Sequence, residues 1–174
     1  MSKRSQPEDF RWCPAPLCGE KEVCWRAWFD GAALPNPGKL GLGVVLQSPD
    51  GTRLEYSERG EGVGCSNEAE LQAVCAALSF ALAAGAQCLV VSGDSDFAVR
   101  HVAGNAHTAV PRLLALIDKA QALAARFQTI EWQWVPRYRN GDADRLSRRV
   151  LGLVHKPAPH PAKALADKRR RRKG

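Results

Sequence analysis

The sequence of 174 residues has no apolar run of about 18 residues, the length that a membrane-spanning helix requires. Its first residues, MSKRSQPEDFRWC, lack the apolar stretch of a secretory signal. No internal repeat is visible, which excludes a solenoid or a propeller. We therefore expect a soluble, monomeric protein of the cytoplasm with no membrane partner.

The context for a disulfide framework is also missing, because no secretory signal precedes the cysteines. We therefore expect reduced thiols. Cys75 and Cys88 lie among apolar residues and are expected to be small core side chains. Cys13, Cys18 and Cys24 fit no common zinc module and have no fourth ligand nearby. The six cysteines are Cys13, Cys18, Cys24, Cys65, Cys75 and Cys88.

An excess of charge is absent from most of the chain, although the net charge is +7. Residues 25–152 hold thirteen basic and thirteen acidic side chains, whereas residues 153–174 hold eight basic residues and one acid. The run at 168–173 (KRRRRK) is either a solvated end or an arm that binds the phosphate backbone of a nucleic acid. The two readings are compatible.

Hydropathy and turn residues divide the chain into an irregular extension (1–24), one domain (25–152) and a basic, disordered tail (153–174). Three strands joined by short turns predict an antiparallel meander, and strands separated by helices add in parallel. The expected fold is α/β, a mixed five-stranded sheet in the order βββαβααβα with helices on its faces. The predicted strands are 25–30, 42–47, 53–58, 87–92 and 130–135, and the predicted helices are 67–84, a short one from about 95, 109–126 and 142–151.

Acidic residues lie where these elements meet. Asp30 ends the first strand, Asp94 follows the fourth, and Glu70 and Asp144 lie near the starts of two helices. Singly, each has a local explanation as a turn residue or a partner of the helix dipole. Glu70 differs, because helical periodicity places it on the apolar face with Val74 and Leu78.

An inward carboxylate is costly unless it is paired or binds a metal ion. Asp30, on the strand beneath that helix, cannot pair with Glu70 while both are anions, but a shared divalent cation would stabilise both. Oxygen ligands without a nearby histidine favour Mg²⁺ or Mn²⁺ over zinc. Glu68 lies on the opposite helical face. Periodicity does not separate Asp142 from Asp144.

Four blocks together resemble the type 1 ribonuclease H family over roughly residues 25–152. They are FDGAALPNPGKLGLGVVL, SNEAEL, VSGDSD and NGDADRLSR, in the family's order and at its spacing. The resemblance implies the same mixed sheet. It also implies that the four metal-binding and catalytic carboxylates are Asp30, Glu70, Asp94 and Asp144, in preference to Glu68, Asp96 and Asp142.

The family's activity is hydrolysis of the RNA strand of RNA/DNA hybrids with two Mg²⁺ or Mn²⁺ ions, leaving a 5′-phosphate and a 3′-hydroxyl. By position, Asn36, Asn67 and Asn140 resemble the family's contacts to the hybrid; alone, they would be turn and cap residues. Many family members have a histidine in the loop before the last helix, where it helps release of product or metal. The stretch VPRYRNGDAD has no histidine, and Arg137 resembles the arginine that the histidine-free branch uses in this catalytic role; alone, it would be a phosphate contact or a solvated charge. The basic handle of some members is missing, and Cys65 replaces a phosphate-binding threonine.

Three other functions are less consistent with these residues. A non-catalytic nucleic-acid-binding protein of the same fold would be expected to have lost a carboxylate, and none is lost. A 3′–5′ exonuclease would carry paired acids on the first strand, where Asp30 has no acidic partner two residues on. A structural protein with a basic tail leaves the inward Glu70 unexplained.

Overall fold

Five strands form one mixed sheet in the order β3-β2-β1-β4-β5 in the computed structural model, which describes residues 24–155 and 157–160. β2 pairs antiparallel with both β1 and β3, whereas β1–β4 and β4–β5 are parallel. The predicted fold class and element order are confirmed. The strands are β1 (Trp25–Leu34), β2 (Gly38–Gln47), β3 (Arg53–Gly64), β4 (Cys88–Gly93) and β5 (Thr129–Trp134).

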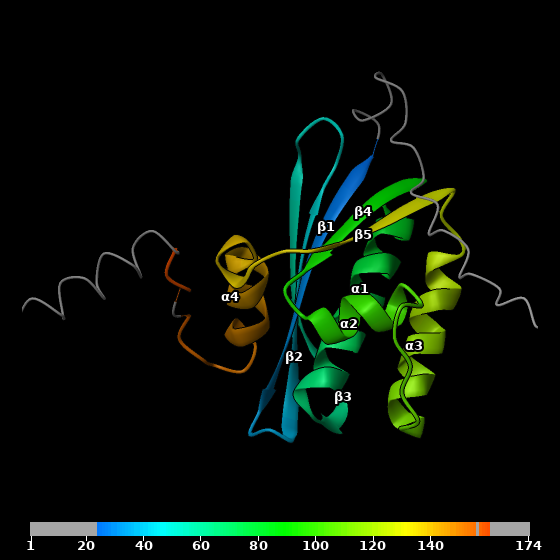
Figure 1. The fold of residues 1–174 in the computed structure, drawn as a ribbon. Coiled ribbons are helices and arrows are strands. Elements are labelled where there is room, and N and C mark those ends of the chain that lie inside the picture. The colour runs from blue at the N-terminus through cyan, green and yellow to red at the C-terminus, as the bar shows by residue number, and fades with distance from the viewer. Residues whose placement is uncertain (1–23, 156, 161–174) are drawn as a thin grey trace, which may run out of the picture.

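Helices cover both faces of this sheet (Figure 1). α1, α2 and α3 lie on one face, where α1 packs on β1 and β2 and α3 packs on α1; α4 lies alone on the other face, against β1 and β2. No helix among the described residues is long and apolar enough to cross a membrane. The helices are α1 (Ser66–Ala83), α2 (Asp96–Val102), α3 (Pro111–Ala124), the 3₁₀ turn η1 (Arg137–Arg139) and α4 (Gly141–Arg149).

The first three strands are longer than the sequence pattern predicted. β1 continues past Asp30 to Leu34, and β2 begins at Gly38, so most of the predicted turn AALPNPGKLG is paired strand. β3 continues to Gly64, with a register shift in β2 between Lys39 and Gly41. The reason is cross-strand hydrogen bonding, which extends a ladder through residues that would be turn formers in isolation.

Side chains along β1 point alternately to the two faces of the sheet, the buried apolar ones to one face and Asp30 to the other. Ala27 and Phe29 are fully buried in the core with the apolar residues of α1. Asp30 therefore points to the opposite face, where α4 lies. The sheet thus brings an acidic residue of its central strand beneath a helix that carries another one.

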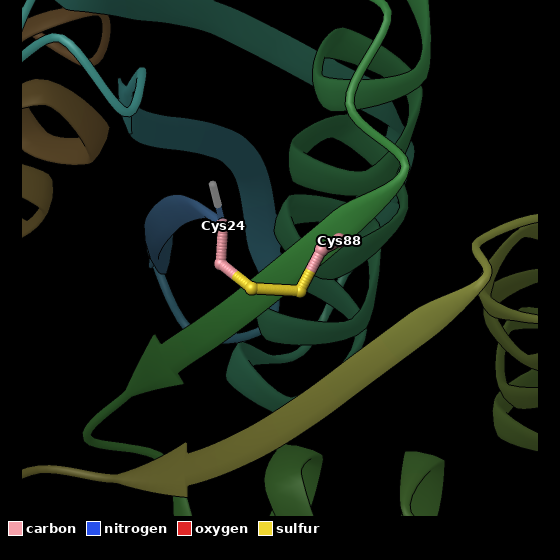
Figure 2. Close-up of a disulfide and its surroundings, with 2 residues drawn as sticks. All are labelled: Cys24 and Cys88. Atoms are coloured by element: carbon pink, nitrogen blue, oxygen red, sulfur yellow. A yellow bond between two sulfur atoms is a disulfide. The ribbon is translucent and has the colours of Figure 1, made fainter. Parts of the chain in front are cut away.

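The reduced state predicted for all cysteines is wrong for two of them: Cys24 and Cys88 form a disulfide (Figure 2). Trp25 pairs with Leu89 in the parallel register of β1 and β4, so the preceding cysteines lie side by side with their Cα atoms 4.7 Å apart. Cys75 is a buried free thiol, as predicted, and burial raises its pKa to about 11. Cys13 and Cys18 lie outside the described residues.

Reduction of this disulfide is expected to lower the free energy of unfolding by about 2–4 kcal/mol, because the bond closes a long loop in the unfolded chain. The cysteines are 64 residues apart. Urea unfolding with and without dithiothreitol measures the effect. Cys24→Ser should already show the reduced stability and should not respond to dithiothreitol; equal stability of the reduced and oxidised wild type would contradict the prediction.

Candidate active site

Four carboxylates from four elements gather near the end of β4. Phe29 pairs with Gly93 in the parallel register, so Asp30 within β1 lies beside Asp94, which follows β4. Glu70 approaches from α1 on one face of the sheet and Asp144 from α4 on the other. The described residues therefore contain the four predicted carboxylates in one place, drawn from segments far apart in the sequence.

Asp30 is 6% exposed and accepts a hydrogen bond from the hydroxyl of Ser147 on α4. Burial raises its pKa from 3.8 to about 7, and the charges of Asp94 and Asp144 add to the rise, while the Ser147 bond opposes it. Without a nearby cation, this carboxyl group holds a proton up to neutral pH. Ser147 was not foreseen from the sequence, since a serine inside a helix carries no distinctive signal.

Glu70 faces β1, as its helical position predicted. Its Oε2 accepts a hydrogen bond of 3.2 Å from the backbone N–H of Gly31. Burial, followed by the charges of Asp30 and Asp94, holds the pKa of Glu70 well above 4.5. Glu68 instead turns back to the start of α1, where it accepts a hydrogen bond of 2.7 Å from the N–H of Cys65.

Asn140 fixes Asp94. Its Nδ2 donates to the carbonyl oxygen of Phe29 at 2.9 Å and to Oδ1 of Asp94 at 2.6 Å, while its Oδ1 is buried with no hydrogen-bond partner among the described residues. Asn140 is only 1% exposed in the structure, and its predicted contact with substrate stays a prediction. Its amide orients a carboxylate and holds β1 to the start of α4.

Asp144 is surrounded by basic groups. Oδ1 accepts hydrogen bonds from Arg137 at 3.0 Å and Arg148 at 3.1 Å, and Oδ2 lies 2.9 Å from Nδ1 of His155. Burial pushes the pKa of Asp144 upward, but Arg148 and Arg137 outweigh it and hold the pKa below 3.8. Asp144 is therefore ionised where Asp30 and Glu70 tend to be protonated.

His155 reaches Asp144 because the chain reverses after α4. Gly152 has a positive φ of +71°, and the N–H of Leu153 donates to the carbonyl oxygen of Arg148 at 3.1 Å, the pattern of a helix C-cap followed by a turn. The following residues then run back along the helix. The segment VPRYRNGDAD, which leads into α4, has no histidine. His155 lies after α4 in the sequence and reaches Asp144 from that side.

Asp96 and Asp142, which lie two residues from Asp94 and Asp144 in the sequence, are outside the carboxylate cluster. Asp142 is exposed and pairs with Arg53 at 2.7 Å, and Asp96 pairs with Arg100 at 3.6 Å. The choice between Asp142 and Asp144, which periodicity left open, is therefore made by how α4 lies on the sheet: Asp144 is 4% exposed and faces Asp30.

Asn36 and Asn67 lie near the start of α1. Asn36, in the turn between β1 and β2, exchanges two hydrogen bonds with Ser66: its Oδ1 accepts from the backbone N–H at 3.1 Å, and its Nδ2 donates to the hydroxyl at 3.3 Å. Asn67 is half-buried and makes no side-chain hydrogen bond within the described residues. The predicted contacts of both residues with substrate remain proposals.

Comparison with known proteins identifies the family. Residues 28–150 match the family described as Reverse transcriptase-like. Over 141 residues the chain is 32% identical to the ribonuclease H of Paracoccus denitrificans, and the match covers 70% of this chain and 88% of that protein. The chain belongs to the ribonuclease H family. A second relative, the ribonuclease HI of Halobacterium salinarum, is 35% identical, with 72% of this chain and 63% of that protein covered.

Solved ribonuclease H structures share the fold. The N-terminal RNase H domain of a Mycobacterium tuberculosis protein superposes with a TM-score of 0.70 at 35% identity, covering 75% of this chain and 94% of that one. LC11-RNase H1, solved in complex with an RNA/DNA hybrid, gives a TM-score of 0.67 at 27% identity, covering 74% and 96%. The chain spans 39% of the length of the bifunctional mycobacterial protein to which it is 37% identical.

The carboxylates of this member of the ribonuclease H family are chemically suited to a hard divalent cation, although no three His, Cys, Asp or Glu side chains among residues 24–155 and 157–160 are close enough to hold one ion as they stand. The observation that supports a cation is electrostatic. Besides burial, the charges of Asp94 and Asp144 raise the pKa of Asp30, and those of Asp30 and Asp94 raise the pKa of Glu70. A divalent cation held among these carboxylates would relieve that repulsion. All-oxygen ligands of this kind suit Mg²⁺ or Mn²⁺.

Proposed function

We propose that this chain is a metal-dependent endonuclease that hydrolyses the RNA strand of RNA/DNA hybrids, leaving a 5′-phosphate and a 3′-hydroxyl. The observation that carries the proposal is the meeting of Asp30, Glu70, Asp94 and Asp144 from four elements at one end of the sheet. The named activity of its relatives supports the same conclusion.

These four carboxylates would hold two divalent ions, Mg²⁺ or Mn²⁺. When bound, the ions supply Lewis-acid stabilisation of the charge that develops on the scissile phosphate and lower the pKa of the attacking water. The protein's part is positioning. Ser147 orients Asp30 and Asn140 orients Asp94.

Arg137 has a second role in this proposal. Its guanidinium holds Asp144 at 3.0 Å, yet 57% of its side chain is exposed at the edge of the cluster. An arginine in that position donates to a phosphate of the bound strand while it keeps Asp144 ionised. Asn36 and Asn67 would contact the hybrid's minor groove, where 2′-hydroxyls distinguish RNA from DNA.

The basic run at 168–173 lies outside the described residues. We propose that it adds affinity for the phosphate backbone without choosing the cut site, because a run of lysine and arginine attracts phosphates whatever the sequence. The monomeric state, the cytoplasmic location and the domain limits also remain predictions.

Incubation with end-labelled duplexes tests the proposed activity. RNA/DNA hybrid should be cut internally in Mg²⁺ or Mn²⁺, and EDTA should stop the reaction. RNA/RNA and DNA/DNA duplexes of the same sequence serve as controls. An intact hybrid in both metals would overturn the proposal.

Metal-free protein is expected to lose stability as the pH rises from about 4 to about 7. The folded state binds protons at Asp30 and Glu70 that the unfolded chain releases at lower pH, so their stabilising contribution is complete below the unfolded pKa and is lost as the pH passes the folded pKa. Mn²⁺ should therefore raise the Tm more at pH 8 than at pH 5. Thermal unfolding with EDTA or Mn²⁺ measures both effects, and Asp30→Asn should reduce the difference. An equal Mn²⁺ effect at both pH values would contradict the prediction.

A further inference from the structure

The last residue of β5 presents a large aromatic side chain beside the carboxylates. Trp134 pairs with Gly93 in the β4–β5 register and is 55% exposed. Along the same strand, Ile130 and Trp132 pack against the core, so the exposure of Trp134 is not a property of the whole strand.

This indole is held in a fixed position relative to the site. Its Nε1 donates a hydrogen bond of 3.2 Å to the main-chain carbonyl oxygen of Asp94. The next residue continues the pairing, because the N–H of Val135 donates to the carbonyl oxygen of Gly93 at 2.9 Å. The ring therefore lies beside Asp94.

The residues that follow Trp134 are basic and aromatic. Arg137 and Arg139 of η1 are exposed, and the guanidinium of Arg139 lies 5.9 Å from the ring centre of Tyr138. Residues 134–140 contain no acid. A ligand that matches this surface offers regularly spaced negative charges with apolar sugar surface between them, as the backbone of a nucleic acid strand does. An apolar peptide would offer no negative charge to the exposed guanidinium groups of Arg137 and Arg139.

We propose that Trp134 packs against the sugar–phosphate edge of the RNA strand, next to the phosphate held at the carboxylates, with Arg137 and Arg139 on neighbouring phosphates. In a duplex the bases stack on each other, so the ribose rings are what the strand presents to the indole. The inference rests on the proposed ribonuclease H activity for the identity of the strand, but its binding step does not require cleavage.

The test measures binding without cutting. A fluorescein-labelled RNA/DNA hybrid is titrated with the full-length protein in EDTA, and anisotropy gives the Kd. Trp134→Ala should raise the Kd about five- to tenfold, because the apolar contact of the indole with the strand is lost, whereas Trp134→Phe should keep most of the affinity. Leu54→Ala is the matched control. Leu54 is also an exposed apolar residue, at 38%, but it lies on β3, two strands from β1. Its level in the sheet is that of Ala27, which is three residues before Asp30 on β1.

A second measurement uses the wild-type protein, in case Trp134→Ala does not fold. Bound hybrid should protect tryptophan fluorescence from acrylamide, and Trp134→Phe should remove most of the protection. Equal Kd values for wild type and Trp134→Ala overturn the inference, as does protection that is unchanged in Trp134→Phe. An equal loss of affinity for a DNA/DNA duplex overturns the assignment to the RNA strand. A hybrid that binds through Trp134 but is never cut overturns the proposed activity and leaves the inference standing; a hybrid that does not bind overturns both.

Discussion

Glu70→Gln is expected to lower hybrid cleavage by about a hundred- to a thousandfold, because it removes one negative charge from the cluster that would hold the cations. Removing a single group that acts electrostatically in a transition state lowers the rate about a hundred- to a thousandfold. Glu70 faces the site, where its carboxylate accepts a hydrogen bond from the N–H of Gly31. Single-turnover cleavage of labelled hybrid in Mg²⁺ and in Mn²⁺ measures the loss.

Glu68→Gln is the control for this substitution, two residues away on the same helix. Glu68 caps the start of α1 and pairs with Arg112 at 3.3 Å. Glutamine can make the same capping contact, so cleavage should stay within a few-fold of wild type. The assignment of the site would be wrong if Glu68 proved essential and Glu70 dispensable.

Glu70→Gln should also be more stable than the wild type when no metal is present. Burial and the charges of Asp30 and Asp94 disfavour an ionised Glu70, and glutamine carries no charge to repel. Thermal unfolding in EDTA at pH 8 should therefore show a higher Tm for Glu70→Gln. A clear decrease would indicate that the carboxylate stabilises the fold through a partner other than a cation.

Gly31→Ala is expected to destabilise the fold by about 2–4 kcal/mol and to abolish cleavage. A Cβ at this position would lie 2.2 Å from the carbonyl carbon of Ala69 and 2.3 Å from the amide nitrogen of Glu70. Both are backbone atoms of α1, so relief requires the helix to move away from β1, and forced expansion of a packed interior is costly. The movement would also carry Glu70 away from Asp30.

Gly141→Ala is the matched control, because a Cβ there meets no atom within 4 Å. Gly141 begins α4, and alanine is the better helix former, so stability should be unchanged or slightly higher. Urea unfolding of both variants and of the wild type measures the difference. Equal stability of Gly31→Ala and Gly141→Ala would show that α1 has room to move.

Much of the fold could be predicted from the sequence because the signals are local. Turn residues and hydropathy gave the element order, and helical spacing placed Glu70 inward and Glu68 outward, as the structure has them. The strand ends were predicted too short, because the pairing of Leu34 with Lys39 depends on a partner strand and not on the residues' own preferences. A local sequence pattern does not show which residues will pair across neighbouring strands.

The disulfide shows the same limit. Compartment and spacing were the only available arguments about Cys24 and Cys88, and they predicted free thiols. The parallel register of β1 and β4 puts the two residues side by side, and no local pattern in the residues between them predicts that register.

The sequence alone determined the fold class, the family resemblance and the set of acids from which the site is built, because periodicity and motif order are properties of short segments. Only the tertiary structure decided which acids meet. The packing of α4 on the sheet buries Asp144 and leaves Asp142 exposed, and Asn140 is buried against Asp94. His155 contacts Asp144, and the indole of Trp134 is bonded to the carbonyl oxygen of Asp94. Each of these depends on contacts between residues distant in the chain, and such contacts form only when the helices and strands pack.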